Sequence, residues 1–92
     1  MEVRLKQGKE ASTLAALEQL SSIAREEVAL IFDVLESAVS LKEAKAALLG
    51  DMLLEGNTFS VSIRENFQFI VAGLLGESDN DEILLVEVML YE

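Results

Sequence analysis

The spacing of apolar residues changes twice along this chain of 92 residues, and this change constrains the fold more than any other feature. Residues 1–6 alternate between apolar and charged side chains, which is typical of a short, half-buried strand. From Glu10 to Val39, apolar residues recur every three or four positions, as in an amphipathic helix that Ser21-Ser22 can kink or break. From Phe59 onward the period returns to two. A chain that changes period in this order belongs to the α+β class.

A second helix is predicted directly after the first. Ser40-Leu41-Lys42-Glu43 has the pattern of a capping box, in which the Ser40 hydroxyl accepts from the Glu43 amide. We therefore expect a helix that begins at Leu41 and ends near Leu54, with Gly56-Asn57 as its stop signal.

Three strands are predicted in the remainder. They span residues 59–64, 67–75 and 83–91, with a tight turn at Glu65-Asn66 and a polar loop over residues 76–81. The predicted order is β-α-α-β-β-β, with a three-stranded antiparallel meander and the helices packed on one sheet face. A length of 92 residues fits one domain, residues 1–92.

Both faces of the last two strands carry large apolar side chains, although an antiparallel sheet usually leaves one face to water. Two helices can cover only one of these faces, so we expect a second copy of the chain to cover the other as a homodimer or higher oligomer. The candidate interface consists of Phe69, Val71, Leu85 and Met89. Two alternatives remain: a monomer whose helices divide between the faces, and a pairing with a different chain.

The negative charge is concentrated in the second half of the chain. Seven Lys and Arg residues stand against 17 Asp and Glu residues, a net charge of −10, and Arg64 is the last basic residue. The densest acidic cluster contains Glu77, Asp79, Asp81 and Glu82. We consider three interpretations: a solvated turn that keeps the sheet edge soluble, a site for Ca²⁺ or Mg²⁺, and a surface that binds a basic protein. Counted as an EF-hand loop, the segment lacks the turn glycine and the bidentate glutamate, and we assign no metal ligand.

Missing residue types argue against several functions. Without cysteine or histidine, the chain has neither a disulfide framework nor a Ser-His-Asp site. The glycines form no nucleotide-binding fingerprint. The scattered basic residues disfavour direct binding of nucleic acid. We predict a protein that is not an enzyme and has no cofactor.

No apolar stretch of the sequence approaches the roughly 18–20 residues of a membrane helix, and the N-terminal residues do not resemble a signal peptide. We therefore expect no membrane association and a cytoplasmic location, with which the absence of cysteine is consistent.

These observations favour a small, acidic, homo-oligomeric interaction protein whose acidic residues 77–82 bind a basic partner surface. A specific form of this hypothesis is an inhibitor that mimics the charge of nucleic acid. One alternative is a structural or assembly subunit whose apolar sheet face is the functional surface. Another is a protein that binds divalent cations.

Overall fold

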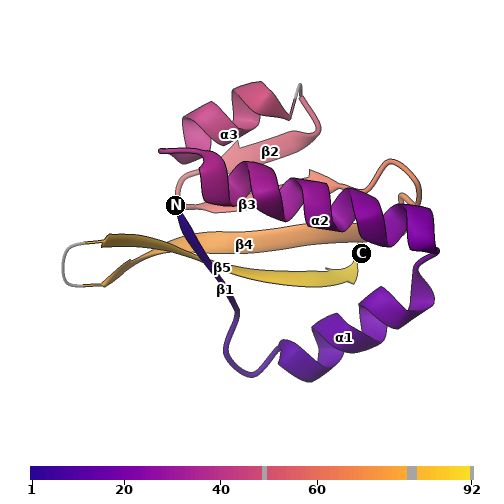
Figure 1. The fold of residues 1–92 in the computed structure, drawn as a ribbon. Coiled ribbons are helices and arrows are strands. Elements are labelled where there is room, and N and C mark those ends of the chain that lie inside the picture. The colour runs from indigo at the N-terminus through magenta and orange to yellow at the C-terminus, as the bar shows by residue number, and fades with distance from the viewer. Residues whose placement is uncertain (49, 79–80, 92) are drawn as a thin grey trace.

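The computed structural model describes residues 1–48, 50–78 and 81–91, and only the backbone of residues 77, 78, 81 and 82. The described residues form three helices and one mixed sheet (Figure 1). The elements are β1 (Glu2–Leu5), α1 (Glu10–Gln19), α2 (Ser22–Ser37), α3 (Leu41–Ala47), β2 (Met52–Glu55), β3 (Thr58–Ser62), β4 (Phe69–Ser78) and β5 (Asp81–Leu90). The α+β class predicted from the sequence is confirmed.

The sheet is larger than the predicted meander. Its five described strands lie in the order β1-β5-β4-β3-β2. Strands β2 to β5 are antiparallel neighbours, whereas β1 pairs in parallel with β5, with Val3 opposite Leu84. The alternating pattern of residues 1–6 predicts a strand but gives no information about its partner, because pairing with β5 joins opposite ends of the chain.

Strand β2 occupies residues that we had assigned to the second helix. Helix α3 ends at Ala47, and Gly50 follows with φ of 90°, a conformation that glycine adopts without strain. Met52 and Leu54 then face the core as β2 pairs with β3 across the turn at Gly56-Asn57. The short apolar run is compatible with either a helix or a strand, so its length alone does not distinguish them.

The long amphipathic segment is divided into α1 and α2 at Leu20 and Ser21. Leu20 has extended backbone angles, and the Ser21 hydroxyl accepts a hydrogen bond from the Ala24 amide at 3.1 Å. This N-cap satisfies one of the unpaired amides at the start of α2. The break allows the two helices to take different directions, as Figure 1 shows.

The connection between β3 and β4 is longer than predicted. Strand β3 ends at Ser62 and β4 begins at Phe69, so the predicted two-residue turn at Glu65-Asn66 is wrong. Ile63 is fully buried, and the Asn66 side chain accepts from the Gln68 amide at 3.0 Å. At the other end of the sheet, the predicted polar loop over residues 76–81 is shorter, because β4 extends to Ser78 and β5 begins at Asp81.

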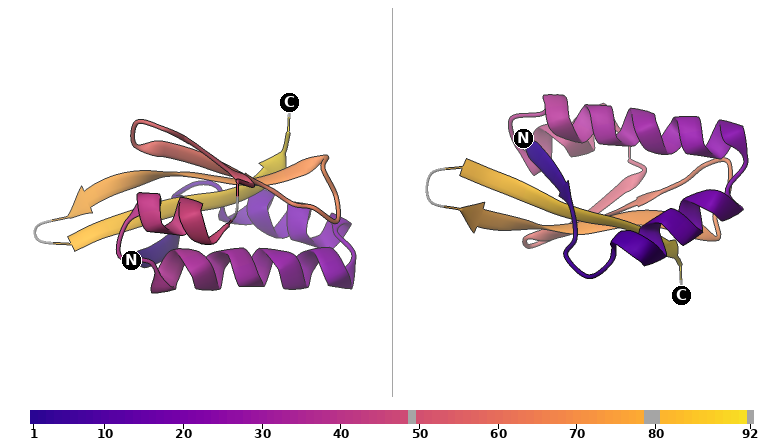
Figure 2. Two further views of the ribbon diagram at one scale, coloured as in Figure 1. Left: turned by 90° about the horizontal axis from the view of Figure 1, so that it is seen from above. Right: turned by 60° about the horizontal axis from the view of Figure 1, so that its bottom comes forward.

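One face of the sheet forms the core together with α2, α3 and the buried side of α1, which contributes Ala16. The buried strand residues on this face are Met52, Phe59, Val61, Phe69, Val71, Leu84, Val86 and Val88. In the part of the chain that the structure describes, no helix covers the opposite face (Figure 2). We call this second surface the open face; its half-buried apolar residues are Ile70, Ala72, Leu74, Leu85 and Met89.

Helix α1 closes the edge of the sheet where β1 ends. Strand β1 pairs with only the first part of β5. Directly after β1, the Lys6 amide donates to the Val86 carbonyl at 2.7 Å. Beyond this point the hydroxyl of Thr13, which is 1 % exposed, accepts from the Val88 amide at 3.3 Å. A helix side chain thus satisfies a strand amide that β1 is too short to reach.

Candidate partner-docking groove

The predicted acidic partner site lies at the far end of the β4–β5 hairpin. Glu77, Asp81 and Glu82 belong to the ends of β4 and β5, and these strand ends project away from α2 (Figure 1). Their side chains lie outside the described residues, as does Asp79 altogether. The structure therefore adds no side-chain geometry to this part of the sequence prediction.

The four predicted interface residues do not share a face of the sheet. Leu85 and Met89 lie on the open face and are half-buried. Phe69 and Val71 point to the other face, where they are 3 % and 0 % exposed within the core of one chain. Because both faces of β4 and β5 are apolar, the sequence alone does not show which residues face the helices. The strand register, which pairs Val71 with Val88, assigns each residue to a face of the sheet.

A different surface, between α2 and α3, has the shape of a binding site. Two adjoining hollows of 440 and 490 Å³ lie along α2 and share Leu30, Val34 and Ala47 in their walls. We call them together the α2–α3 groove. The first hollow extends to Ile23 and to the end of β3, and the second extends to Ala38 and α3.

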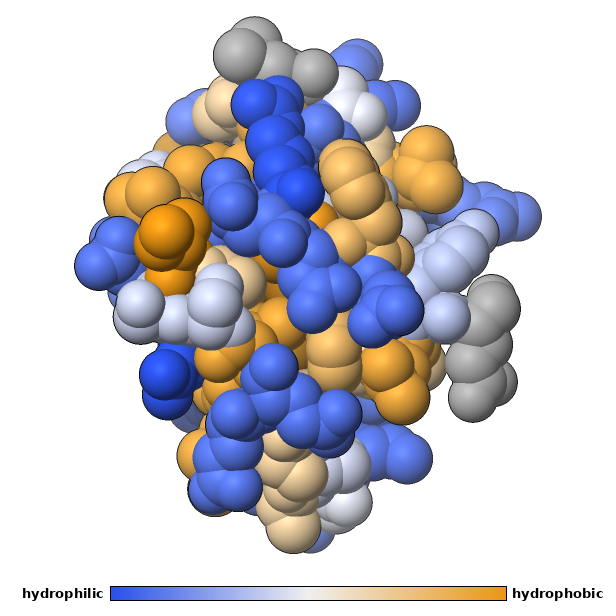
Figure 3. All heavy atoms as spheres, turned by 90° about the vertical axis from the view of Figure 1, so that its right-hand side faces the viewer, coloured by the Kyte–Doolittle hydropathy of each residue, from blue (hydrophilic) through white to orange (hydrophobic). Residues whose placement is uncertain are grey.

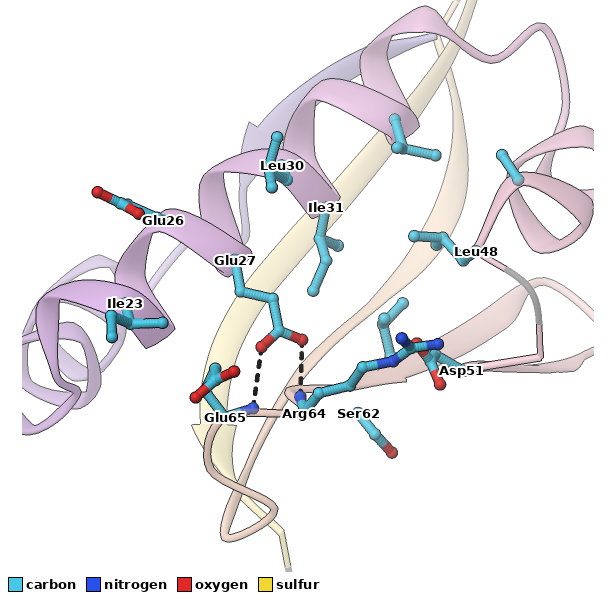
Figure 4. A pocket seen from close by; sticks show the side chains of 13 residues that line it. Ile23, Glu26, Glu27, Leu30, Ile31, Leu48, Asp51, Ser62, Arg64 and Glu65 are labelled. Carbon is cyan, nitrogen blue, oxygen red and sulfur yellow. Dashed lines mark hydrogen bonds and ion pairs between the residues drawn. The ribbon is translucent and has the colours of Figure 1, made fainter.

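The apolar side chains that α2 contributes to the groove are Ile23, Leu30 and Val34, together with Ile31 of the buried stripe. Ala24, Val28, Ile31 and Leu35 form the buried stripe that packs on the sheet. Leu30 lies on the next stripe of the helix and is 64 % exposed, although it is a large apolar residue. Figure 4 shows Ile31 pointing toward the sheet and Leu30 on the outer side of the helix. Figure 3 views the end of the molecule where α1 meets α2, and hydrophobic atoms are visible there between hydrophilic side chains.

One end of the groove is fixed by polar contacts. The Glu27 carboxylate accepts from the backbone amides of Arg64 at 2.6 Å and Glu65 at 3.0 Å, which ties α2 to the chain after β3 (Figure 4). The Arg64 side chain pairs with Asp51, with 2.6 Å between Nε and Oδ2. This hydrogen bond and the charge of Asp51 raise the pKa of the Arg64 guanidinium above its ordinary value.

The groove has a strongly acidic border. Its walls include six acidic residues and one basic residue, Arg64, whose charge is already matched by Asp51. The six acids are Glu26, Glu27, Asp33, Glu43, Asp51 and Glu65. Within the described part of the chain, Glu26, Asp33, Glu43 and Glu65 take part in no ion pair. The groove thus combines an apolar floor with unneutralised carboxylates.

Only part of this groove was predictable from the sequence. Ile23 and Leu30 widen the helical apolar stripe beyond what one buried face needs, and an acidic residue follows each of them three positions later, Glu26 and Asp33. The sequence does not show which other segments lie beside these residues. In the structure, Ala47 of α3 and Arg64 of the chain after β3 lie against the same side of α2.

A second carboxylate of interest is Glu87, which interrupts the apolar pattern of β5. It is 8 % exposed and pairs with Lys6 of the neighbouring chain segment, with 3.3 Å between Oε2 and Nζ. Glu87 lies on the open face, opposite Ala72 and between Leu85 and Met89, and the pair neutralises its charge there. A buried charge without such a partner would cost several kcal/mol by general estimates.

Metal-binding geometry is not found in the described side chains. No group of three or more acidic residues is arranged among them to hold a cation. The segment around Asp79, which suggested a cation site in the sequence, lies outside this set. Among the described helices, none is long and apolar enough to cross a membrane.

Comparisons of the chain with protein-family models, with curated proteins and with solved structures give no match.

Proposed function

We propose that this protein is a non-catalytic interaction protein that docks a positively charged surface of a partner protein in the α2–α3 groove. The border of that groove, with six acidic residues and a single, already paired arginine, is the observation that supports this proposal most. Complementary charge steers a basic partner to such a surface and orients it. The apolar side chains of the groove, among them Leu30, Val34 and Ala47, then supply contact area that excludes water.

The same charge distribution supports a narrower form of the proposal. A protein with a net charge of −10 can occupy a basic groove that another protein uses for nucleic-acid phosphates.

The dependence of binding on salt tests the proposal. The probe is a Lys- and Ala-rich peptide, and its affinity for the protein is measured by calorimetry at about 50 and 500 mM NaCl. Over this range the Debye length falls from roughly 14 to 4 Å, so we expect the affinity to fall about tenfold or more. Absence of binding at low salt, or an affinity that salt does not change, would overturn the proposal. A peptide with Glu in place of Lys serves as the control and should not bind.

The open face favours a second candidate function, as an assembly subunit that associates with its own copies. On this face Ile70 lies opposite Met89 and Leu74 lies opposite Leu85, with Ala72 and Glu87 between the two pairs and no helix of the described chain over them. An apolar sheet face of this kind is commonly covered by another chain. Measurement of the solution mass by light scattering at micromolar concentration tests this candidate, and a monomer mass would exclude it.

A further inference from the structure

We propose that the α2–α3 groove receives an amphipathic α-helix of the partner, with apolar residues along one side and Lys or Arg residues flanking them. This inference rests on the proposed function and narrows it, because it specifies the conformation of the partner segment. The groove follows α2, whose 16 residues span about 24 Å, the length of a helix of similar size.

The backbone of the groove walls argues for a helix over an extended segment. Extended peptides bind proteins chiefly by pairing their backbone with the free edge of a sheet. Here α2 forms one long wall, and its backbone amides and carbonyls are already paired to each other. On the opposite side, beyond the short helix α3, the amides of Ser62, Arg64 and Glu65 already donate to Asp51 and Glu27. An occupant that lies along α2 must therefore satisfy its own backbone groups, as a helix does.

The spacing of the groove residues along α2 supports the same conclusion. Ile23, Leu30 and Val34 are separated by seven and four positions, with Glu26 and Asp33 between them on the same side of the helix. The apolar residues of α2 that line the groove thus recur every one or two helical turns. Side chains along one face of a second helix recur at the same intervals, so the two sets can interdigitate. A carboxylate accompanies nearly every turn, so flanking cations on the occupant would meet a partner at each step.

The experiment uses the full chain and three synthetic peptides of about 18 residues, which as helices would be about 27 Å long. The first contains Leu on one helical face and Lys on the flanks, with Ala elsewhere. The second has the same composition in an order that places Leu on all sides. The third replaces each Lys by Glu. We expect only the first to bind with a gain of helical circular dichroism and with chemical-shift changes at Leu30, Val34 and Ala47.

Matched variants locate the binding. Leu30 and Leu14 are both helical leucines, 64 % and 58 % exposed, and Leu14 lies on α1 away from the groove. Leu30→Ser should weaken binding of the first peptide about tenfold, whereas Leu14→Ser should change it less than about twofold. Because both side chains are exposed, neither change should alter the thermal midpoint of the protein appreciably.

A second pair of variants tests the flanking charges at equal net charge. The double change Glu26→Gln and Asp33→Asn removes two carboxylates of the groove, and Glu18→Gln with Glu36→Gln removes two exposed carboxylates elsewhere. The first pair should weaken binding about tenfold and the second less than about threefold, because the direct contacts exceed the effect of overall charge.

The possible failures are distinguishable. Equal affinity of the first and second peptides would overturn the helix inference and leave the proposed docking of a basic partner in place. Absence of binding by either Lys peptide would overturn both. Equal loss in Leu30→Ser and Leu14→Ser would remove the groove as the site. If the free protein is a dimer that Leu30→Ser converts to a monomer, the occupant is a second copy of this chain, and the partner helix is refuted.

Discussion

At the scale of single residues, Gly73 shows how closely the sheet is packed. A Cβ atom added at this position would overlap the carbonyl oxygen of Leu85 and lie 2.9 Å from Cζ of Phe59. We expect Gly73→Ala to lower the free energy of unfolding by about 2–3 kcal/mol, because the buried Phe59 ring or the β5 backbone must shift. Gly76→Ala on the same strand is the control, since its nearest neighbours lie 3.7 and 3.8 Å away. Urea unfolding of both variants measures the difference, and equal stabilities would contradict this account.

The buried hydroxyl of Thr13 permits a second prediction at the residue scale. Thr13→Val keeps the shape of the side chain but leaves the Val88 amide without its acceptor. An unsatisfied buried amide costs about 1–3 kcal/mol, and we expect a loss of this size in the free energy of unfolding. Thr58→Val makes the same change at an exposed hydroxyl that donates to the Glu55 carbonyl, so it should cost less than about 0.5 kcal/mol. Chemical denaturation that finds the two variants equally stable would show that the Thr13 contact contributes little.

At the scale of elements, the break between α1 and α2 determines whether replacing Ser21 by Ala stabilises or destabilises the protein. Ser21 caps α2, so Ser21→Ala should destabilise the protein by about 1 kcal/mol. In a continuous helix the same substitution would be neutral or stabilising, because Ala has the higher helix propensity. Ser22→Ala, one position inside α2, is the control and should stay within about 0.5 kcal/mol of the parent. The thermal midpoints of the two variants distinguish two separate helices from one continuous helix. A higher midpoint in Ser21→Ala would contradict the break.

The helices and strands differ in how far they could be predicted from the sequence. The N-cap at Ser40 was predictable, and the structure shows its hydroxyl accepting from Glu43, because a cap depends on residues adjacent in the chain. Strand β2 was not, since Met52–Glu55 becomes a strand only through its pairing with β3. The α2–α3 groove likewise depends on contacts between distant segments, such as Glu27 with the amides after β3. Local chemistry predicted helix starts and strand periods, while pairing partners and the site required tertiary contacts.

At the scale of the whole molecule, the two candidate surfaces differ in electrostatic character. The α2–α3 groove gathers carboxylates around apolar side chains, whereas Glu87, the acidic residue between Leu85 and Met89 on the open face, is neutralised by Lys6. A partner in the groove must therefore bring positive charge. Two copies meeting at their open faces would instead bring together two chains of −10 each. Salt should therefore affect the two associations in opposite directions.

The opposite effects of salt on the two associations can be measured. Screening reduces the repulsion between two acidic chains, so self-association through the open face should strengthen between about 50 and 500 mM NaCl, while binding of a Lys peptide weakens. Leu85→Asp places a carboxylate on the open face and should abolish the association, whereas Leu14→Asp adds the same charge on α1 and should not. Light scattering across the salt series measures both variants, with circular dichroism to confirm folding. Self-association that weakens with salt, or that Leu14→Asp disrupts equally, would mean that the open face is not the surface through which the copies meet.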